Sequence, residues 1–162
     1  MERKNVTELT QAAMIAAIYV VLTVVFAPFG FGEVQIRISE MLTVLPLFTP
    51  AAVPGLFIGC FIGNLLGGAV IADVLGGSIA TLLGALLTRK LRKQARWIAL
   101  LPPVAANIGI VPLVLRYAYG VALPIPLMMA TVGVGELVSC EVLGGVLASV
   151  LEKYRFQIWK RN

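Results

Sequence analysis

The sequence predicts an all-α membrane protein, a bundle of six transmembrane helices whose N and C termini are both cytoplasmic. Composition is the first observation, because 59% of the 162 residues are hydrophobic and only 13% are charged, which is too few to cover a water-soluble chain. The second is that the apolar runs are much longer than the strands of a membrane barrel, so helices must satisfy the backbone in lipid. The third is the grouping of the basic residues, which orients the helices.

The first helix is expected over residues 9–27, after a polar start. At about 20 residues per crossing, the chain has room for roughly five to seven helices and no separate soluble domain. We therefore expect residues 1–162 to form a single transmembrane domain. A cleaved signal peptide ending near Ala27 is the alternative, and the acidic lead-in before residue 9 counts against it.

The second and third helices are short. Residues 38–48 would span about 16 Å as an α-helix and residues 54–66 about 20 Å, less than a hydrocarbon core of about 30 Å. If residues 38–66 made one crossing, the basic loop at 89–96 would lie opposite the basic N-terminus, against the positive-inside rule. Two short or extended crossings, or a re-entrant hairpin, restore the rule, and we favour two crossings that turn near Thr49 and Pro50.

The last three helices are expected over residues 73–91, 97–117 and 126–154. Eleven of the thirteen basic residues gather in three places, which we expect to be cytoplasmic. They are Arg3 and Lys4; Arg89, Lys90, Arg92, Lys93 and Arg96; and Lys153, Arg155, Lys160 and Arg161. The net charge of +5 is thereby explained by topology, and a nucleic-acid partner is not expected.

Several chemical classes are not supported. The chain has no histidine, and Cys60 and Cys140 stand alone in apolar runs without metal-ligand spacing, so we expect buried free thiols and no metal. There is no phosphate-binding glycine loop and no nucleophile with a partnering base. We therefore expect no catalytic residues, no cofactor and no enzymatic activity.

A few charged residues remain once the cytoplasmic and near-terminal ones are set aside, and nearly all map to the outer half of the bundle. They are Glu33, Arg37, Glu40, Asp73, Arg116, Glu136 and Glu141. Ionisable groups inside a membrane are costly and need a partner, a proton or a ligand, so Glu136 and Glu141 are the leading binding candidates. The alternative is an internal ion pair with Arg116 or Arg37 that pins the helices together. Of the two, Glu141 is the better candidate for a structural role.

Other polar and aromatic side chains have two interpretations each. Asn107 can bind a flat polar heterocycle through its donor and acceptor, or can form an interhelical hydrogen bond. Aromatic residues at the expected outer boundary can stack on a planar ligand or belong to the interfacial belt. They are Phe29, Phe31, Tyr117 and Tyr119. Asp73 precedes an apolar run and is expected to cap the helix that follows.

Small residues recur four apart, a spacing that lets helices approach closely. The rows are Ala12 and Ala16; Ala13 and Ala17; Gly55, Gly59 and Gly63; and Gly76, Ala80 and Gly84. Packing within the chain explains most of them. An external partner is plausible chiefly for the alanines of the first helix, at its cytoplasmic end.

Several stretches of the chain resemble one family of transporters. They are Val34-Gln35-Ile36-Arg37-Ile38-Ser39-Glu40, Leu45-Pro46, Phe48-Thr49-Pro50-Ala51, Pro54-Gly55-Leu56-Phe57-Ile58-Gly59, Asn64-Leu65, residues 73–83 and Leu115-Arg116-Tyr117-Ala118-Tyr119-Gly120. Together they are similar to the QueT family of queuosine-precursor transporters. These proteins are substrate-binding S components of energy-coupling factor (ECF) importers, to which the six helices and the alanine-rich first helix also correspond.

The resemblance implies a function, a ligand and partners. The chain would capture a deazaguanine base from outside, in a pocket capped by residues 28–37, and deliver it inward with a membrane-embedded T component and two cytoplasmic ATPases. We expect the substrate-binding residues to be Glu136, Asn107, Arg37, Glu40, Tyr117, Arg116, Glu141 and Glu33. The resemblance places Ala12, Ala13, Ala16 and Ala17 at the contact with the T component. The expected location is the cell membrane.

A self-sufficient homo-oligomeric channel or permease is the alternative from another class. In that case the face of the last helix with Glu136 and Glu141 would line a path. A capture subunit binds its ligand without partners and needs ATP for uptake, whereas a channel leaks without either, so purified protein distinguishes the two.

Overall fold

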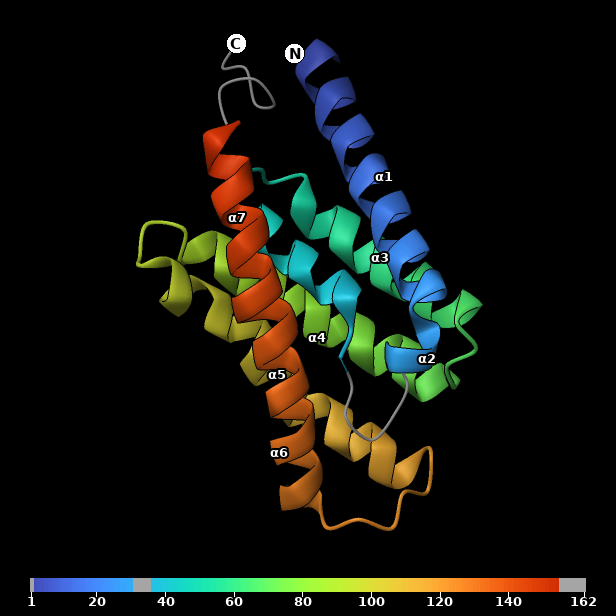
Figure 1. Ribbon diagram of the computed structural model, residues 1–162. Helices are drawn as coiled ribbons and strands as arrows, with labels where there is room; N and C mark the ends of the chain where they lie inside the picture. Colours follow the sequence, from blue (N-terminus) through green and yellow to red (C-terminus); the bar gives the residue numbers. More distant parts are fainter. Residues whose placement is uncertain (1, 31–35, 155–162) are drawn as a thin grey trace.

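The fold is known from a computed structural model that describes residues 2–30 and 36–154, and the regular elements in these ranges are all helices (Figure 1). They are α1 (Glu2–Val25), α2 (Ala27–Gly30), η1 (Ile38–Leu47), α3 (Ala52–Leu66), α4 (Ile71–Lys90), α5 (Arg96–Tyr117), α6 (Ile125–Glu136), η2 (Leu137–Leu143) and α7 (Gly144–Lys153). The predicted all-α fold is confirmed for these residues.

Four helices are long and apolar enough to cross a membrane: Asn5–Val25 of α1, all of α4, all of α5, and the continuous run Ile125–Lys153. Apolar side chains cover their outer faces, as expected for helices in lipid. Leu9 on α1 is 72% exposed and Ile71 on α4 is 74% exposed. Large apolar side chains therefore lie on the outside of the bundle as well as in its core, which agrees with the membrane protein predicted from composition.

The two short segments, η1 and α3, lie where the sequence predicts them. The ten residues of η1 form a 3-10 helix that contains Pro46, and its steeper rise of about 2.0 Å per residue extends it to about 20 Å. In an α-helix the ring of Pro46 would clash with the carbonyl of residue 42, which disfavours the α-helical alternative. The chain then turns around Thr49, whose hydroxyl donates to the side chain of Gln11 at 3.0 Å. This contact brings the turn beside the first half of α1.

Glycines explain how closely α1 and α3 pack. A Cβ on Gly55 would lie 2.7 Å from the Ala12 carbonyl oxygen, and one on Gly59 would lie 2.7 Å from the Tyr19 Cβ. A Cβ on Gly63 would lie 3.1 Å from Thr23. Successive glycines of α3 therefore meet successive turns of α1, so the two helices are parallel. The segment η1, which connects them, runs in the opposite direction. The rows Ala12 and Ala16 on α1 and Gly55, Gly59 and Gly63 on α3 form this contact.

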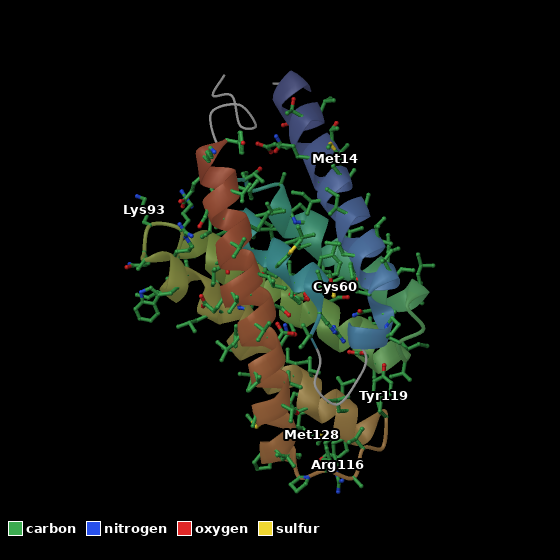
Figure 2. All side chains as sticks on the ribbon, viewed as in Figure 1. Met14, Cys60, Lys93, Arg116, Tyr119 and Met128 are labelled. Carbon is green, nitrogen blue, oxygen red and sulfur yellow. The ribbon has the colours of Figure 1, made fainter. Side chains whose placement is uncertain are left out.

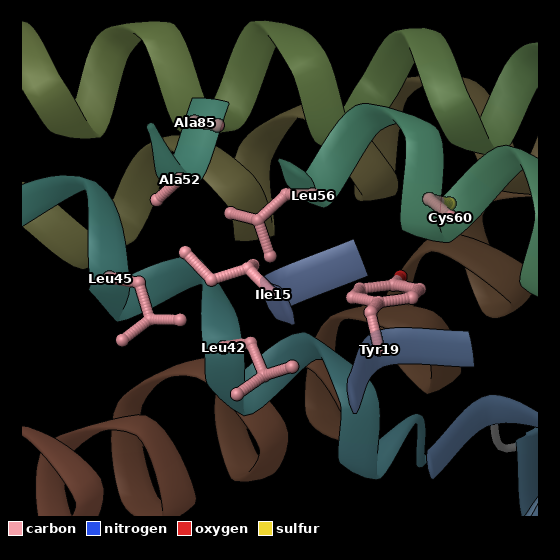
Figure 3. Close-up of a cluster of buried hydrophobic side chains, with 8 residues drawn as sticks. All are labelled: Ile15, Tyr19, Leu42, Leu45, Ala52, Leu56, Cys60 and Ala85. Carbon is pink, nitrogen blue, oxygen red and sulfur yellow. The ribbon is translucent and has the colours of Figure 1, made fainter. Parts of the chain in front are cut away.

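The largest apolar core joins α1, η1, α3 and α4. Two of its members, Leu56 and Cys60 of α3, are fully buried. The members are Ile15, Tyr19, Leu42, Leu45, Ala52, Leu56, Cys60 and Ala85 (Figure 3). Tyr19 is the only one of them with a hydroxyl group, and its ring fixes that hydroxyl at the edge of the core.

Hydrogen bonds define two ends of the bundle. At one end Arg89 donates to the Pro46 carbonyl at 3.0 Å, and Arg96 donates to Glu152 at 2.9 Å. The start of α1 and the end of α7 lie at this end (Figure 1). At the other end the Tyr119 hydroxyl donates to Asp73 at 3.1 Å. The basic residues around the loop between α4 and α5 thus contact the end of η1 and the end of α7.

A π-helix interrupts the last long helix. The element η2 covers Leu137–Leu143, directly after Glu136, and packs against η1 and α5. A π-helix accommodates extra residues per turn and is often found at functional sites. Here it holds Cys140 against the carbonyl of Glu40 at 3.8 Å, and so brings the last helix to the start of η1.

Candidate functional site

Glu40 lies at the centre of the bundle and is fully buried. One of its oxygens, Oε1, accepts a short hydrogen bond from the Tyr19 hydroxyl and a second one from Thr81 at 3.4 Å. The other oxygen, Oε2, has no hydrogen-bond partner among the described residues. The hydrogen bonds to Oε1 therefore hold the Glu40 side chain in place, and Oε2 is left to accept a further hydrogen bond.

Glu136 faces Glu40 from the last helix and is 2% exposed. The Cys140 thiol, one turn further along, donates to Glu136 at 3.4 Å, and Thr43 of η1 donates to the same sulfur at 3.5 Å. Ligand atoms of Glu40, Glu136 and Cys140 all lie within 4.8 Å of one another. Two carboxylates that are 96 residues apart in the chain thus meet inside the bundle.

Asn107, on α5, completes this group and is 1% exposed. Its amide is close enough to Glu136 to interact with it, yet neither its nitrogen nor its oxygen meets a hydrogen-bond partner of normal geometry among the described residues. A buried amide without partners is costly, by about 1–3 kcal/mol. We call Glu40, Glu136, Cys140 and Asn107 the polar cluster. Asn107 thus interacts with Glu136 across two helices without a hydrogen bond of normal geometry in the described part of the chain.

A second buried polar group lies beside the polar cluster. Arg37 and Asp73 form an ion pair at 3.3 Å, with both side chains at least 96% buried. The Tyr119 hydroxyl also donates to Asp73. Gly77 leaves room for this group, because a Cβ there would lie 3.0 Å from the Asn64 amide and 3.4 Å from Arg37.

The role predicted for Asp73 is wrong. The residue before α4 is Val70, which makes no side-chain cap, and Asp73 is instead the third residue of the helix. From there its carboxylate points inward to Arg37. Its place in the first turn favours a negative charge through the helix dipole, and a buried guanidinium supplies the partner. Arg37, one of the two arginines considered as partners for Glu136 or Glu141, thus forms a salt bridge with Asp73.

Two of the predicted site residues lie outside the polar cluster. Tyr117 is 79% exposed at the end of α5, and Arg116 is exposed and donates to the Val121 carbonyl at 3.1 Å. Figure 2 shows Arg116 far from Cys60, near the opposite end of the view from the basic loop. The inward-facing tyrosine of this segment is Tyr119, one of the boundary aromatics noted in the sequence.

Glu141 and Glu33 complete the predicted set. Glu141 is half-buried within η2, and its Oε1 lacks a partner among the described residues. Glu33 lies in residues 31–35, outside the described residues, as does Phe31 and much of the segment expected to cap the pocket. The structure therefore brings Glu40, Glu136 and Asn107 together, with Arg37 beside them.

Sequence reasoning missed the side chains that position the cluster. Tyr19 and Thr81 bind Glu40, Thr43 binds Cys140, and Asn64 contacts Cys60 at 3.5 Å. Tyr19 carried a usable signal, because a tyrosine hydroxyl in the middle of an apolar run usually has a buried partner. Threonines carried none, since they are common in membrane helices.

The expectation about the cysteines is confirmed, because Cys60 and Cys140 are both buried and free. Glu40, Glu136 and Cys140 are close enough to offer three ligand atoms to a metal ion. The thiol, however, is placed as a hydrogen-bond donor to Glu136, and the set mixes hard oxygen with soft sulfur. The arrangement suits an organic ligand that donates N–H groups better than it suits a metal.

A hollow of about 600 Å³ lies at the basic end of the bundle. Its lining residues are Leu47, Phe48, Arg89, Arg92, Lys93, Gln94, Arg96 and Glu152. Two of the arginines are held in place by the hydrogen bonds of Arg89 to Pro46 and of Arg96 to Glu152. This hollow is separate from the polar cluster and has the charge expected of a cytoplasmic face.

Long apolar helices around a buried cluster of hydrogen-bonding groups define a helical membrane protein with a polar interior. A family model described as the QueT transporter matches residues 9–153, nearly the whole chain. The chain belongs to the QueT transporter family, and the resemblance stated from the sequence is confirmed. A search of curated proteins and a search of solved structures each found no match.

Proposed function

We propose that this chain is the substrate-binding S component of an ECF importer and that it captures a deazaguanine precursor of queuosine. Membership of a transporter family and the membrane-length helices support a role in transport. The observation that carries the proposal is the polar cluster, in which Asn107 and one oxygen of Glu40 lack partners although they are buried. Such groups are tolerated where a ligand completes their hydrogen bonds.

The cluster fits the chemistry of a guanine-like base. A carboxylate such as Glu136 can accept two parallel N–H bonds from the edge of the ring, and these charge-assisted bonds are among the strongest in proteins. The Asn107 amide can bind the remaining donor and acceptor of the ring. Bringing these two side chains together from different helices allows one planar molecule to contact both.

The proposed topology has six crossings in the cell membrane, with η1 and α3 as the short ones. The basic end, which includes the start of α1 and the α4–α5 loop, would be cytoplasmic. The polar cluster would then be reached from the side of Tyr119 and Asp73. The T component and the two ATPases would act at or from the basic end.

The alanines of α1 divide into two pairs. Ala12 and Ala16 are buried, and they face the glycines of α3. Ala13 and Ala17 are exposed. We propose that the first pair holds α1 close to α3 and that the second pair forms the part of the partner contact open to the T component.

The function is tested with purified protein in detergent. Equilibrium binding of a deazaguanine base at one ligand per chain, without any other protein, is the expected result. Uptake into vesicles should require the T component, the ATPases and ATP. Ligand flux without these partners would identify a channel or permease and would contradict the proposal.

A matched pair of substitutions tests the partner contact. Ala17→Leu should leave ligand binding and thermal stability unchanged and should lower the yield of the assembled complex in pull-down. Ala16→Leu should lower stability by about 1–3 kcal/mol, because the added atoms have no space against α3. Normal assembly of the Ala17→Leu protein would remove this face of α1 from the contact.

A further inference from the structure

We propose that the hollow at the basic end of the bundle binds the phosphate of an anionic phospholipid. This hollow of about 600 Å³ lies where η1, α4 and α7 end and α5 begins, and it is separate from the polar cluster. The proposal therefore goes beyond the proposed function, and either of the two can fail without the other.

Positive charge is in excess around the hollow. Among the described residues that line it, one is a carboxylate, Glu152, and four are cationic: Arg89, Arg92, Lys93 and Arg96. Glu152 pairs with Arg96 at 2.9 Å, and the other three cations have no carboxylate partner in the described chain. A concave site with unpaired cations attracts an anion.

The cations differ in how they are held. Arg96 donates to α7, and Arg89 donates to the end of η1 through Nη1, which leaves its second terminal nitrogen for an oxygen of a phosphate. Arg92 donates to a backbone carbonyl at 3.3 Å, and Lys93 donates to no group of the described chain. The hollow thus has positioned donors on one side and adaptable ones on the other, and guanidinium groups suit phosphate oxygens well.

The apolar part of the lining favours a lipid over a free phosphate ion. Leu47 and Phe48 lie in the same hollow as the cations. A small soluble anion would leave these side chains against water. The glycerol and the first carbons of the acyl chains of a lipid would cover them, while its phosphate meets the cations.

The hollow also lies at the level of lipid headgroups. Both α4 and α5 have the length of a membrane crossing, so the loop between them lies at the membrane surface, and Figure 2 shows Lys93 on this loop at the edge of the bundle. Trp97, beside Arg96, is 63% exposed, and tryptophan favours this level. Leu87 and Leu101, one turn from either end of the loop, are also exposed and provide apolar surface for acyl chains. Basic pockets between helices at the cytoplasmic side are a known kind of site for anionic headgroups.

The fluorescence of Trp97 provides the test. The full-length chain with Trp159→Phe, in which Trp97 is the one tryptophan, is reconstituted into phosphatidylcholine vesicles. The vesicles contain either brominated phosphatidylglycerol or the same fraction of brominated phosphatidylcholine. Bromine quenches tryptophan on contact, so the two quenching curves give the preference for the anionic lipid. We expect a preference of about fivefold or more.

Two double substitutions distinguish a site from general surface charge. Arg92→Gln with Lys93→Gln should bring the preference near one, because it removes the two cations that the fold uses least. Lys90→Gln with Lys153→Gln is the matched control: both lysines are exposed at the basic end, outside the lining, and the preference should remain. Equal quenching by the two lipids would overturn the inference, as would an equal loss in both double variants. Should the first variant not fold, the preference of the Trp159→Phe chain decides.

Inorganic phosphate separates the lipid from a soluble ligand. Sodium phosphate and sodium chloride at matched ionic strength should lower the quenching by phosphatidylglycerol equally, since both only screen the charges. A much larger effect of phosphate would assign the hollow to a soluble phosphate and overturn the lipid assignment. Binding of a deazaguanine base to the same preparations tests the proposed function separately.

Discussion

Two buried polar groups lie side by side in this bundle, and they differ in whether all their polar atoms have partners. In the ion pair each charge has a partner: Arg37 meets Asp73, and Tyr119 adds a further hydrogen bond to the carboxylate. In the polar cluster Asn107 and one oxygen of Glu40 have none within the described chain. Both groups are equally remote from solvent, so burial alone does not distinguish them.

This difference distinguishes a group that stabilises the fold from a group that is available to bind a ligand. A buried charge with its own partner stabilises the arrangement of the helices, and removing one member leaves the other uncompensated. Buried groups with unused hydrogen-bonding capacity lower stability unless something binds them. We therefore expect substitutions in the ion pair to change folding, and substitutions in the polar cluster to change ligand affinity.

The largest effect is expected from Asp73→Asn. It leaves the Arg37 charge buried without a carboxylate and should lower the free energy of unfolding by about 3–5 kcal/mol. Thermal or denaturant unfolding in detergent measures this. The double substitution Arg37→Met with Asp73→Leu should recover most of the loss, because an apolar pair needs no compensation. Unchanged stability of Asp73→Asn would remove the distinction between the two groups.

Glu136→Gln should produce the next largest effect, on binding rather than folding. Loss of the charge-assisted bonds should weaken ligand affinity by about tenfold or more, equivalent to about 1.4 kcal/mol or more. Stability should stay the same or rise, since a buried charge is removed. Isothermal titration and thermal unfolding on the same preparation give both values. An affinity equal to that of the wild type would exclude Glu136 from the site.

Asn107→Leu should change the free energy of unfolding in the opposite direction to Asp73→Asn. Replacing an amide that lacks partners with an apolar side chain of similar size should raise the free energy of unfolding by about 1 kcal/mol. Ligand affinity should fall, because the ring loses its amide partner. A destabilised Asn107→Leu protein would show that the amide already has a structural partner, and Asn107 would then belong with the ion pair.

Tyr119→Phe should have the smallest effect. It removes the hydrogen bond to Asp73 and should cost less than about 1 kcal/mol, because Tyr119 is partly exposed. Partial burial and the nearby Asp73 charge raise the pKa of the Tyr119 hydroxyl above 10.0. The folded state therefore holds this proton more tightly than the unfolded state, and the resulting stability is present below pH 10 and lost as the pH rises above it.

The pH dependence is measured as the difference between the two proteins. Wild-type stability should fall towards that of Tyr119→Phe above pH 10, while lysines common to both cancel in the comparison. Parallel curves for the two proteins would show that Tyr119 makes no such contribution.

The sequence predicts the bundle well and the site in part. Glu136 and Asn107 are conspicuous because a polar residue in an apolar run must be explained by a partner or a ligand. The two short helices follow from combining their length with the positive-inside rule. The sequence does not predict that one of them is a 3-10 helix or that the last helix contains a π-helix. Both features depend on packing, and no residue pattern indicates them.

Side-chain direction at helix ends could not be predicted. Tyr117 and Tyr119 are two residues apart, and which of them faces inward depends on where α5 ends and on the turn that follows. The partner of Arg37 could not be predicted either, because 36 residues separate it from Asp73 and several other acidic residues were possible partners. The hydroxyl of Tyr19 pointed to a buried partner, but the sequence did not indicate that this partner is Glu40, 21 residues further along the chain.

The shape of η1 has one more consequence. Because a 3-10 helix repeats every three residues, Glu40, Thr43 and Pro46 form a straight row along it. Glu40 stands at the polar cluster, and the Pro46 carbonyl accepts the hydrogen bond of Arg89 at the basic end. At about 2.0 Å per residue the row is about 12 Å long, so it connects the Glu40 carboxylate directly to Arg89 at the end of α4, and a ligand that displaces Glu40 would also displace this contact.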